Sequence, residues 1–159
     1  PYASVIDAFG YLEQELGITE KVSPFEDGNK AWVKPFMELS QLTNLLGVCL
    51  FASITLAVKG STWTGLYNAV TGLKMTTDEM LKAAERVINL ERMFNVSEGF
   101  ERRDDVLPQR LTKEAAPDGL GKGQVVKMDI VLDEFYKTMD WDLKTGIPKK
   151  EKLKELGLI

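Results

Sequence analysis

The chain has 159 residues, of which 44% are hydrophobic and 28% charged, a composition typical of one folded domain rather than of a disordered segment. Its formal net charge of −4 argues against a general nucleic-acid or anionic-membrane binder, because such proteins present a basic face. The sequence has no histidine and one cysteine, Cys49. These counts exclude Ser-His-Asp catalysis, an internal disulfide and a complete Cys-only metal site within this chain.

No targeting or membrane signal is visible. Residues 1–17 mix acidic and apolar side chains, unlike the charged-then-apolar order of a signal peptide. Residues 45–58 form the longest apolar run, but they contain Gly, Ser and Thr and fall short of the roughly 20 residues that a membrane span requires. We therefore expect a cytoplasmic protein that makes no membrane contact. The chain begins with Pro1 instead of Met, so we expect a piece of a longer protein.

Helical spacing of apolar residues predicts the first elements. Residues 2–16 and 30–46 each repeat apolar side chains three or four positions apart. Pro35 lies inside the second segment and cannot donate a backbone hydrogen bond, so we expect this helix to begin close to Pro35 or to kink there. Gly47 interrupts the pattern. Residues 51–57 are apolar, and periodicity alone leaves open whether they are helical or extended.

Residues 77–95 carry the strongest helix signal. Thr76 precedes them and Glu79 follows three residues later, which is the signature of a capping box. One apolar stripe runs along this segment. Its predicted members are Met80, Ala84, Val87, Leu90 and Phe94, widened by Leu81 and Ile88.

Two shorter helices are predicted at residues 129–139 and 148–156. Residues 97–127 separate the strong helix from the first of these two helices. They contain several Pro and Gly residues and little helical periodicity. Such long irregular segments are usually functional or disordered. No segment alternates as a strand does. The sequence therefore predicts an all-α fold, an irregular multi-helix domain over residues 1–159 with one long irregular loop segment at 97–127.

Several polar groups invite a functional interpretation. Residues 119–124 are rich in glycine but lack the spacing of a phosphate-binding loop, so we interpret them as an ordinary loop. Asp104 and Asp105 could form a paired-carboxylate acid/base site, but neighbouring arginines favour an ion-pair network that pins the long loop. A solvated helix face, or pairing between helices, is enough to explain the charged residues Glu85, Glu91 and Arg92. We expect a core or interface position for Trp32, Trp63 and Trp141.

Cys49 allows two interpretations. A lone cysteine in an apolar run is commonly a small buried hydrophobic residue. Alternatively, residues 44–49 end a helix and break at Gly47, and such a turn can present a thiolate to an iron–sulfur cluster. A four-cysteine cluster would take one thiolate from this chain, and the others would have to come from elsewhere.

Two longer motifs point to a known family. Residues 87–100 read Val-Ile-Asn-Leu-Glu-Arg-Met-Phe-Asn-Val-Ser-Glu-Gly-Phe, and residues 103–110 read Arg-Asp-Asp-Val-Leu-Pro-Gln-Arg. Both resemble the C-terminal region of the tungsten-containing aldehyde ferredoxin oxidoreductases. The resemblance extends in the family's order from residue 30 onwards and includes 132–136, 141–142, 145–148 and 151–158.

The resemblance implies that this chain is the C-terminal domain of a longer oxidoreductase. Enzymes of this family have an N-terminal β domain and two mostly helical domains, which hold a tungsten or molybdenum bis-pterin beside a [4Fe–4S] cluster. They oxidise aldehydes to carboxylic acids and pass electrons to ferredoxin. The implied partners are thus the N-terminal and middle domains, ferredoxin and an aldehyde. Both cofactors would be present only in the full-length enzyme, and the isolated fragment would be inactive.

The resemblance also assigns site residues. In the family, three cluster cysteines lie in a CxxCxxxC run of the middle domain, and the fourth ends an Asp-x-x-Gly-Leu-Cys motif. Residues 44–49 align with that motif, so Cys49 would be the fourth cluster ligand. Asn44 would occupy the position of a pterin-contacting aspartate, and it differs by donating as well as accepting hydrogen bonds without a charge. The backbone at Gly47 and Val48 would approach the pterin.

No catalytic residue is assigned, because the family's acid/base residues lie upstream or involve a histidine. Residues 97–127 are expected to wall the active-site cavity or the substrate channel. A surface that faces the other domains should be apolar. We expect it at Leu45, Leu46, Val48, Leu50 and Phe51. The competing function class is a non-enzymatic helical scaffold or protein-interaction module in which Cys49 is a buried core residue.

Overall fold

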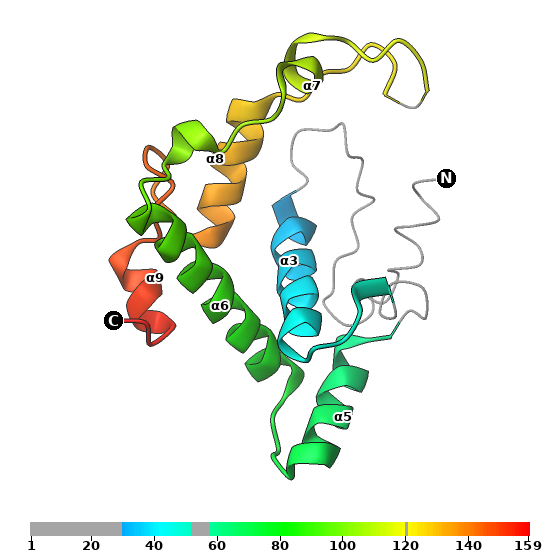
Figure 1. Ribbon diagram of the computed structural model, residues 1–159, viewed down its shortest axis with the longest axis vertical. Helices are drawn as coiled ribbons and strands as arrows, with labels where there is room; N and C mark the ends of the chain where they lie inside the picture. The colour runs from blue at the N-terminus through cyan, green and yellow to red at the C-terminus, as the bar shows by residue number, and fades with distance from the viewer. Residues whose placement is uncertain (1–29, 52–57, 120) are drawn as a thin grey trace. The chain divides into compact units, whose positions relative to one another are not determined.

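The structure is a computed structural model that describes residues 30–51, 58–119 and 121–159 (Figure 1). The predicted helix at 2–16 and the apolar residues 52–57 lie outside the described residues. The helices in chain order are α3 (Lys30–Leu45), α5 (Gly60–Thr71), α6 (Thr77–Ser97), η1 (Arg102–Asp104), α7 (Gln109–Lys113), α8 (Met128–Met139) and α9 (Lys150–Glu155). Within these ranges the β pairing consists of two isolated bridges, Ala116 with Lys122 and Trp141 with Pro148. The predicted all-α class is confirmed.

The predicted helices at 77–95 and 129–139 are confirmed as α6 and α8 to within two residues at each end. α3 begins at Lys30 and carries Pro35 within it, so the proline does not set the start of the helix. The last helix, α9, begins at Lys150, two residues after Pro148. None of the described helices is both long and apolar enough to cross a bilayer.

The helix α5 was not predicted from the sequence. Its twelve residues include two glycines and three threonines, which have low helix propensity, and its N-cap Lys59 makes no side-chain capping bond. Tyr67 packs against a cluster of buried residues from α3 and α6, described next, and this packing compensates for the weak local preference. The helix ends at Gly72, whose φ of 76° is the left-handed conformation that glycine adopts without strain.

The described residues divide into two compact units, and the first is built on Pro35–Ile88. Its core joins α3 to α6 through five buried residues: Leu39, Leu42, Met80, Leu81 and Ala84. Each leucine buried in this way contributes about 1.5–3 kcal/mol relative to an exposed one. The connection from α5 to α6 is fixed by Asn68, whose amide donates to the Met75 carbonyl at 2.8 Å and accepts from the Met75 N–H at 3.0 Å.

The predicted capping box at the start of α6 is confirmed. The Thr76 N–H and hydroxyl both donate to Glu79 Oε2, at 2.7 Å and 3.0 Å, and the Glu79 N–H donates to Thr76 Oγ1 at 3.2 Å. The hydrogen bond from the Thr76 backbone, followed by the one from its hydroxyl, lowers the pKa of the exposed Glu79 carboxyl. These bonds satisfy donors that a helix start leaves without intrahelical partners.

The predicted apolar stripe of α6 is wrong beyond Ile88. Leu90 and Phe94 are 55% and 65% exposed, whereas Asn89 is fully buried and Arg92 is 8% exposed. Glu85 is buried as well, so a solvated face does not describe the polar side of this helix. From Asn89 onwards the buried face is polar, because Asn89 and Arg92 hydrogen-bond to other groups of the second unit, as described below.

The second unit is built on Asn89–Ile159, together with residues 30–34. Its buried apolar residues are Tyr136, Met139, Trp141, Leu153 and Leu156. The Trp141 ring meets Phe135 edge-on at a centroid distance of 5.5 Å, and its Nε1–H donates to Asn89 Oδ1 at 2.9 Å. The predicted core position of Trp141 is confirmed. Trp63 is half-buried, and the side chain of Trp32 lies outside the described residues.

The long segment predicted at 97–127 is largely irregular, with η1 and α7 as its helical turns. No described residue in this segment is buried. Figure 1 shows α7 and the loop that follows it extending beyond the first turn of α8. The segment therefore takes its shape from hydrogen bonds and from anchors at its ends, because it has no apolar core of its own.

Candidate functional site

The turn that carries Cys49 is defined by how α3 ends. The Val48 N–H donates to the Thr43 carbonyl at 3.0 Å, and the Gly47 N–H donates to the Asn44 carbonyl at 3.0 Å. Gly47 has a φ of 68°. These two nested hydrogen bonds around a left-handed residue form a Schellman motif, which satisfies carbonyl groups at the helix end. The backbone leading to Cys49 is therefore fixed.

Cys49 follows this motif as an exposed free thiol. The expectation of a small buried hydrophobic residue is therefore wrong. In the described ranges, no group of three or more His, Cys, Asp or Glu side chains is arranged to hold a metal ion. A cluster bound at Cys49 would take its other ligands from outside the described residues. The exposed thiol and its fixed turn fit a single-ligand role.

The residues beside Cys49 differ in what they offer a cofactor. Asn44 is exposed, and its side-chain amide nitrogen donates to Gln41 Oε1 at 3.2 Å. The N–H groups of Gly47 and Val48 are engaged in the Schellman motif. A cofactor near them would therefore meet their carbonyl oxygens or their carbon atoms.

Part of the predicted apolar surface is present around this turn. Leu45, Leu50 and Phe51 are 47%, 38% and 75% exposed, whereas Leu46 and Val48 are half-buried. Leu46 packs against the first core. The turn thus presents a thiol among exposed apolar side chains.

A second constellation lies in the unit built on Asn89–Ile159. Arg92 of α6 donates from Nη1 to Asp105 Oδ1 at 2.9 Å and from Nη2 to Asp105 Oδ2 at 2.6 Å. Its Nε donates to the Gly146 carbonyl at 2.9 Å, and the Tyr136 hydroxyl donates to Asp105 Oδ2 in a short hydrogen bond. The guanidinium also lies 5.0 Å from the centroid of the Trp141 ring. Three segments of the chain thus meet at one arginine.

Burial and charge act in opposite directions on the carboxyl of this network. Burial favours the neutral form of Asp105, but the hydrogen bonds from Arg92 and Tyr136 and the charges of Arg92 and Arg102 outweigh it and lower the pKa. Burial and the Asp105 carboxylate together raise the pKa of Tyr136 to about 12. Asp105 is therefore ionised and Tyr136 neutral at ordinary pH, so this carboxylate is set to hold a cation and not to exchange protons.

Arg102 ties the same region together from the other side. It pairs with Asp133 of α8 at 2.7 Å and donates to the Leu143 carbonyl at 2.8 Å. Its backbone N–H donates to the Thr145 carbonyl at 3.0 Å. Asp142 closes this turn by accepting from the N–H and hydroxyl of Thr145, which lowers the pKa of Asp142. The two arginines together fix the turn at 142–147.

The ion-pair interpretation of Asp104 and Asp105 is confirmed, and the acid/base interpretation is wrong. The two carboxylates serve separate partners, because Asp104 accepts from the Glu101 N–H at 2.8 Å while Asp105 holds Arg92. The sequence analysis placed Arg92 on the polar side of its helix but did not pair it with Asp105. No local signal marks this pairing, because apolar Leu90 and Phe94 continue the predicted stripe on the same helix.

Two hollows flank α7 within the second unit. One, of about 560 Å³, is lined by Leu111, Ala115, Pro117 and Val125 among others. The other, of about 660 Å³, has Val106, Leu107 and Leu132 in its wall and Arg103, Lys113 and Lys144 among its charged members. Within the glycine-rich stretch, Gly119 and Gly123 have φ values of 74° and 77°, and Gly121 and Gln124 line the first hollow, as expected for an ordinary loop.

Comparison with known proteins bears on both constellations. A family model described as "Aldehyde ferredoxin oxidoreductase, domains 2 & 3" matches residues 3–158. The chain belongs to this family. The aldehyde ferredoxin oxidoreductase match covers the Cys49 turn as well as the Arg92 network. It confirms the resemblance drawn from residues 87–100 and 103–110.

Individual relatives agree with this assignment. The chain is 36% identical to a tungsten-containing aldehyde ferredoxin oxidoreductase of Pyrococcus horikoshii, 37% to one of Pyrococcus furiosus and 34% to one of Thermococcus kodakarensis. Each comparison spans 146 residues, which is 90% of this chain and 24% of the relative. The chain therefore spans about a quarter of the length of the aldehyde ferredoxin oxidoreductases that it matches.

Proposed function

We propose that this chain is the C-terminal part of a tungsten-pterin aldehyde:ferredoxin oxidoreductase. The full-length enzyme would oxidise aldehydes to carboxylic acids in the cytoplasm and pass electrons through a [4Fe–4S] cluster to ferredoxin. Family membership and the tungsten-containing relatives support this proposal. The tungsten or molybdenum bis-pterin and the cluster would be present only in the full-length enzyme, and this chain alone would be inactive.

The observation that carries the proposal is the exposed thiol of Cys49 on a fixed turn. Cys49 would supply one thiolate to the cluster, and the remaining three would come from the rest of the enzyme. When bound, the cluster supplies one-electron transfer. The Schellman motif at Gly47 holds the Cys49 backbone in place, so that little ordering is required when the thiolate binds iron.

The neighbours of Cys49 would face the pterin. Asn44 is exposed, and its side-chain oxygen would accept a hydrogen bond from a pterin nitrogen. Gly47 and Val48 would contribute their carbonyl oxygens, since their N–H groups already bond to α3. No residue of this chain is proposed as catalytic. The irregular residues 97–127, anchored through Arg92, would wall the active-site cavity or the substrate channel.

The test uses the full-length polypeptide that carries this chain, purified without oxygen. We expect Cys49→Ala to lose most of its iron and acid-labile sulfide per polypeptide, and the electron paramagnetic resonance signal of the reduced cluster to disappear. Cys49→Ser should keep part of the iron with an altered signal, because an alkoxide is a poorer iron ligand than a thiolate. The matched control is Ser97→Ala, another small exposed side chain. Full iron content and an unchanged signal in Cys49→Ala would overturn the proposal.

The competing class, a non-enzymatic scaffold with a packed cysteine, has less support. It requires Cys49 in the core, and the thiol is exposed. The same experiment separates the two classes, because a scaffold would contain no iron in any variant.

A further inference from the structure

The hollow of about 660 Å³ beside α7 has an apolar part that is in contact with water. Its apolar side chains come from the loop before α7 and from the start of α8: Val106, Leu107, Met128 and Leu132. Val106 and Leu107 are 67% and 37% exposed, whereas the other two are half-buried. A ligand with an apolar body would remove this surface from water, which is favourable. The volume of the hollow is in the usual range of small-molecule sites, about 300–1,000 Å³.

Arg102 gives the same hollow a cation whose position is fixed. Its side chain is 20% exposed, pairs with Asp133 at 2.7 Å and donates to the Leu143 carbonyl at 2.8 Å. The guanidinium also lies over the Tyr136 ring, 5.1 Å from the ring centroid. A guanidinium has five N–H donors, so these contacts leave donors for an anion. Because the group is already held, little side-chain entropy is lost when an anion binds to it.

Three further cations line the hollow: Arg103, Lys113 and Lys144. Lys113 makes no ion pair within the described residues. Arg103 is 75% exposed, and its carboxylate partners lie at 3.6 Å and 4.0 Å, so these contacts hold it weakly. The side chains of Arg103 and Lys113 are therefore free to turn toward a bound anion.

The charges of the wall favour one negative charge on the ligand. The wall has three carboxylates against its four cations: Glu101, Asp105 and Asp129. Asp105 and Arg102 have outside partners, Arg92 and Asp133, whose opposite charges cancel each other. An excess of one positive charge remains. A single bound monoanion would neutralise it, whereas a cation or a multiply charged anion would leave the hollow charged.

We propose that this hollow binds an organic monoanion with an apolar body, of the size of an arylacetate. The carboxylate of the ligand would lie at Arg102 and Lys113, and its ring against Leu107 and Leu132. Inorganic anions lack the body that the apolar wall selects, and neutral aromatic molecules lack the charge. The inference goes beyond the proposed function, because neither Cys49 nor a bound cofactor takes part in the site.

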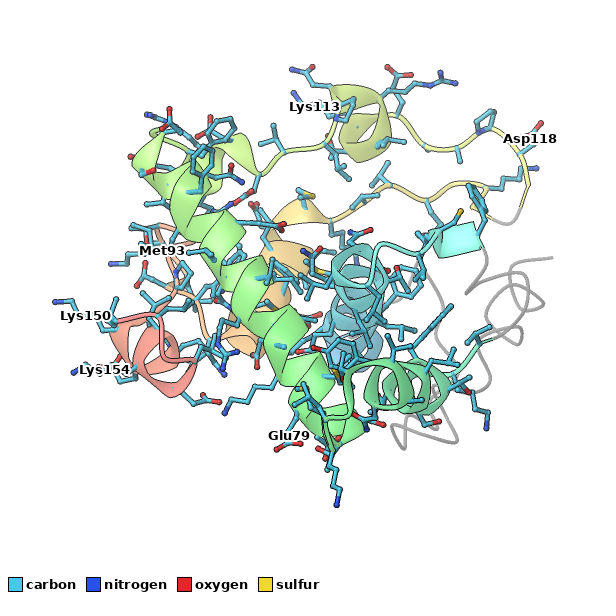
Figure 2. All side chains as sticks on the ribbon, turned by 60° about the horizontal axis from the view of Figure 1, so that its bottom comes forward. Glu79, Met93, Lys113, Asp118, Lys150 and Lys154 are labelled. Atoms are coloured by element: carbon cyan, nitrogen blue, oxygen red, sulfur yellow. The ribbon has the colours of Figure 1, made fainter. Side chains whose placement is uncertain are left out.

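The test reads the hollow itself, because the proposed reaction would also form carboxylates and its own site would bind them. Lysines of the full-length polypeptide are acetylated at constant ionic strength with and without phenylacetate, and mass spectrometry gives the rate at each lysine. We expect phenylacetate to slow acetylation about threefold at Lys113 and Lys144 once most sites are filled. The internal control is Lys154, since Figure 2 shows Lys113 on α7 and Lys154 on α9, well apart from it. Unchanged rates at Lys113 and Lys144, or equal slowing at Lys154, would overturn the proposal.

Two further compounds separate the two parts of the ligand. Acetate has the charge without the apolar body, and phenylethanol has the body without the charge. Each should require a concentration about tenfold higher than that of phenylacetate for the same protection. Equal protection by acetate would mean that an adventitious anion only is bound, and equal protection by phenylethanol would mean that the cations do not matter. Either result overturns the proposal.

Two substitutions test the wall of the hollow in the full-length polypeptide. Leu107→Asn removes apolar surface and Lys144→Gln removes a charge, and both residues are exposed. Each should raise about fivefold the phenylacetate concentration that half-protects Lys113. Ile159→Asn is the matched control, because Ile159 is 67% exposed and does not line the hollow. Unchanged half-protection in both variants would contradict the proposal. Iron content measured on the wild type and on Cys49→Ala reports separately on the cluster, so the two proposals can fail independently.

Discussion

Arg92 and Asp105 are joined by two parallel hydrogen bonds, of 2.9 Å and 2.6 Å, between a helix and the start of a long loop. The arginine is 8% exposed and the aspartate 27%. A two-pronged pair between guanidinium and carboxylate is the strongest form of ion pair in proteins, and only arginine can make it. This contact, and not an apolar core, holds the irregular segment 97–127 to α6.

Replacing Arg92 should therefore cost far more than replacing a surface arginine. We expect Arg92→Ala to lower the free energy of unfolding by about 3 kcal/mol, because Asp105 and the Gly146 carbonyl would lose their donor in a half-buried place. Urea denaturation measures this change. Arg103→Ala is the matched control, since Arg103 is 75% exposed with oxygen partners at 3.6 Å and 4.0 Å, and it should change stability by less than about 0.5 kcal/mol. Equal losses in the two variants would refute the prediction.

The lowered pKa of Asp105 predicts a specific response to acid. Its unfolded carboxyl titrates near 3.8 and its folded carboxyl below that value, so the ionised form stabilises the fold above this pH. That contribution is lost as the pH falls from 3.8 through the folded pKa. The stability difference between the wild type and Asp105→Asn should be constant near neutral pH and shrink below 3.8. Denaturation at a series of pH values tests this, and a difference that grows on acidification would contradict it.

The left-handed conformation of Gly47 predicts opposite effects for two glycine substitutions. At Gly47 the φ is 68°, so Gly47→Ala should destabilise the chain by about 1 kcal/mol. Gly65 lies inside α5 with open space around it, and Gly65→Ala should stabilise the chain by about 0.5–1 kcal/mol. Both values come from thermal or urea unfolding. A neutral or stabilising effect of Gly47→Ala would show that the turn before Cys49 is not held as described.

Gly146 combines the same backbone constraint with a close approach. Its φ is 71°, and a methyl group there would collide with the Arg92 guanidinium and the Tyr136 ring. We expect Gly146→Ala to cost about 3 kcal/mol, the sum of backbone strain and overpacking. Gly157→Ala is the control, because its φ is 66° and nothing lies within 4 Å of the added atom, so it should cost about 1 kcal/mol. Equal thermal shifts for the two variants would mean that the close approach does not matter.

Local signals in the sequence predict the helices well where they are strong. The capping box of Thr76 and Glu79 and the spacing of apolar residues place α6 and α8 closely. α5 has no such signal, because its threonines and glycines favour other conformations and its formation depends on packing with distant residues. The prediction of which α6 residues form the buried stripe fails for a related reason. Whether Leu90 or Arg92 is buried depends on which distant segment the helix meets, and the local sequence does not contain that information.

The two constellations differ in the same way. The turn at Gly47 and Cys49 is local, so the sequence indicates both its break and its unusual cysteine. The Arg92 network joins residues separated by 13 to 54 positions along the chain, and only the folded structure brings them together. The irregular segment 97–127 could be predicted in part, since its Pro and Gly residues disfavour regular helices. The exposure of its apolar side chains could not, because it depends on how the second unit packs.

Arg92, Asp105 and Tyr136, which anchor the irregular segment 97–127, also determine how this anchor responds to acidity. Asp105 gains a proton only below its ordinary value of 3.8, and Tyr136 loses one only at about pH 12. The sequence has no histidine that could titrate between these limits. The anchor therefore keeps one charge state over the whole range in which cells live. Any acid or alkaline limb in the activity of the proposed enzyme should originate in residues outside this anchor.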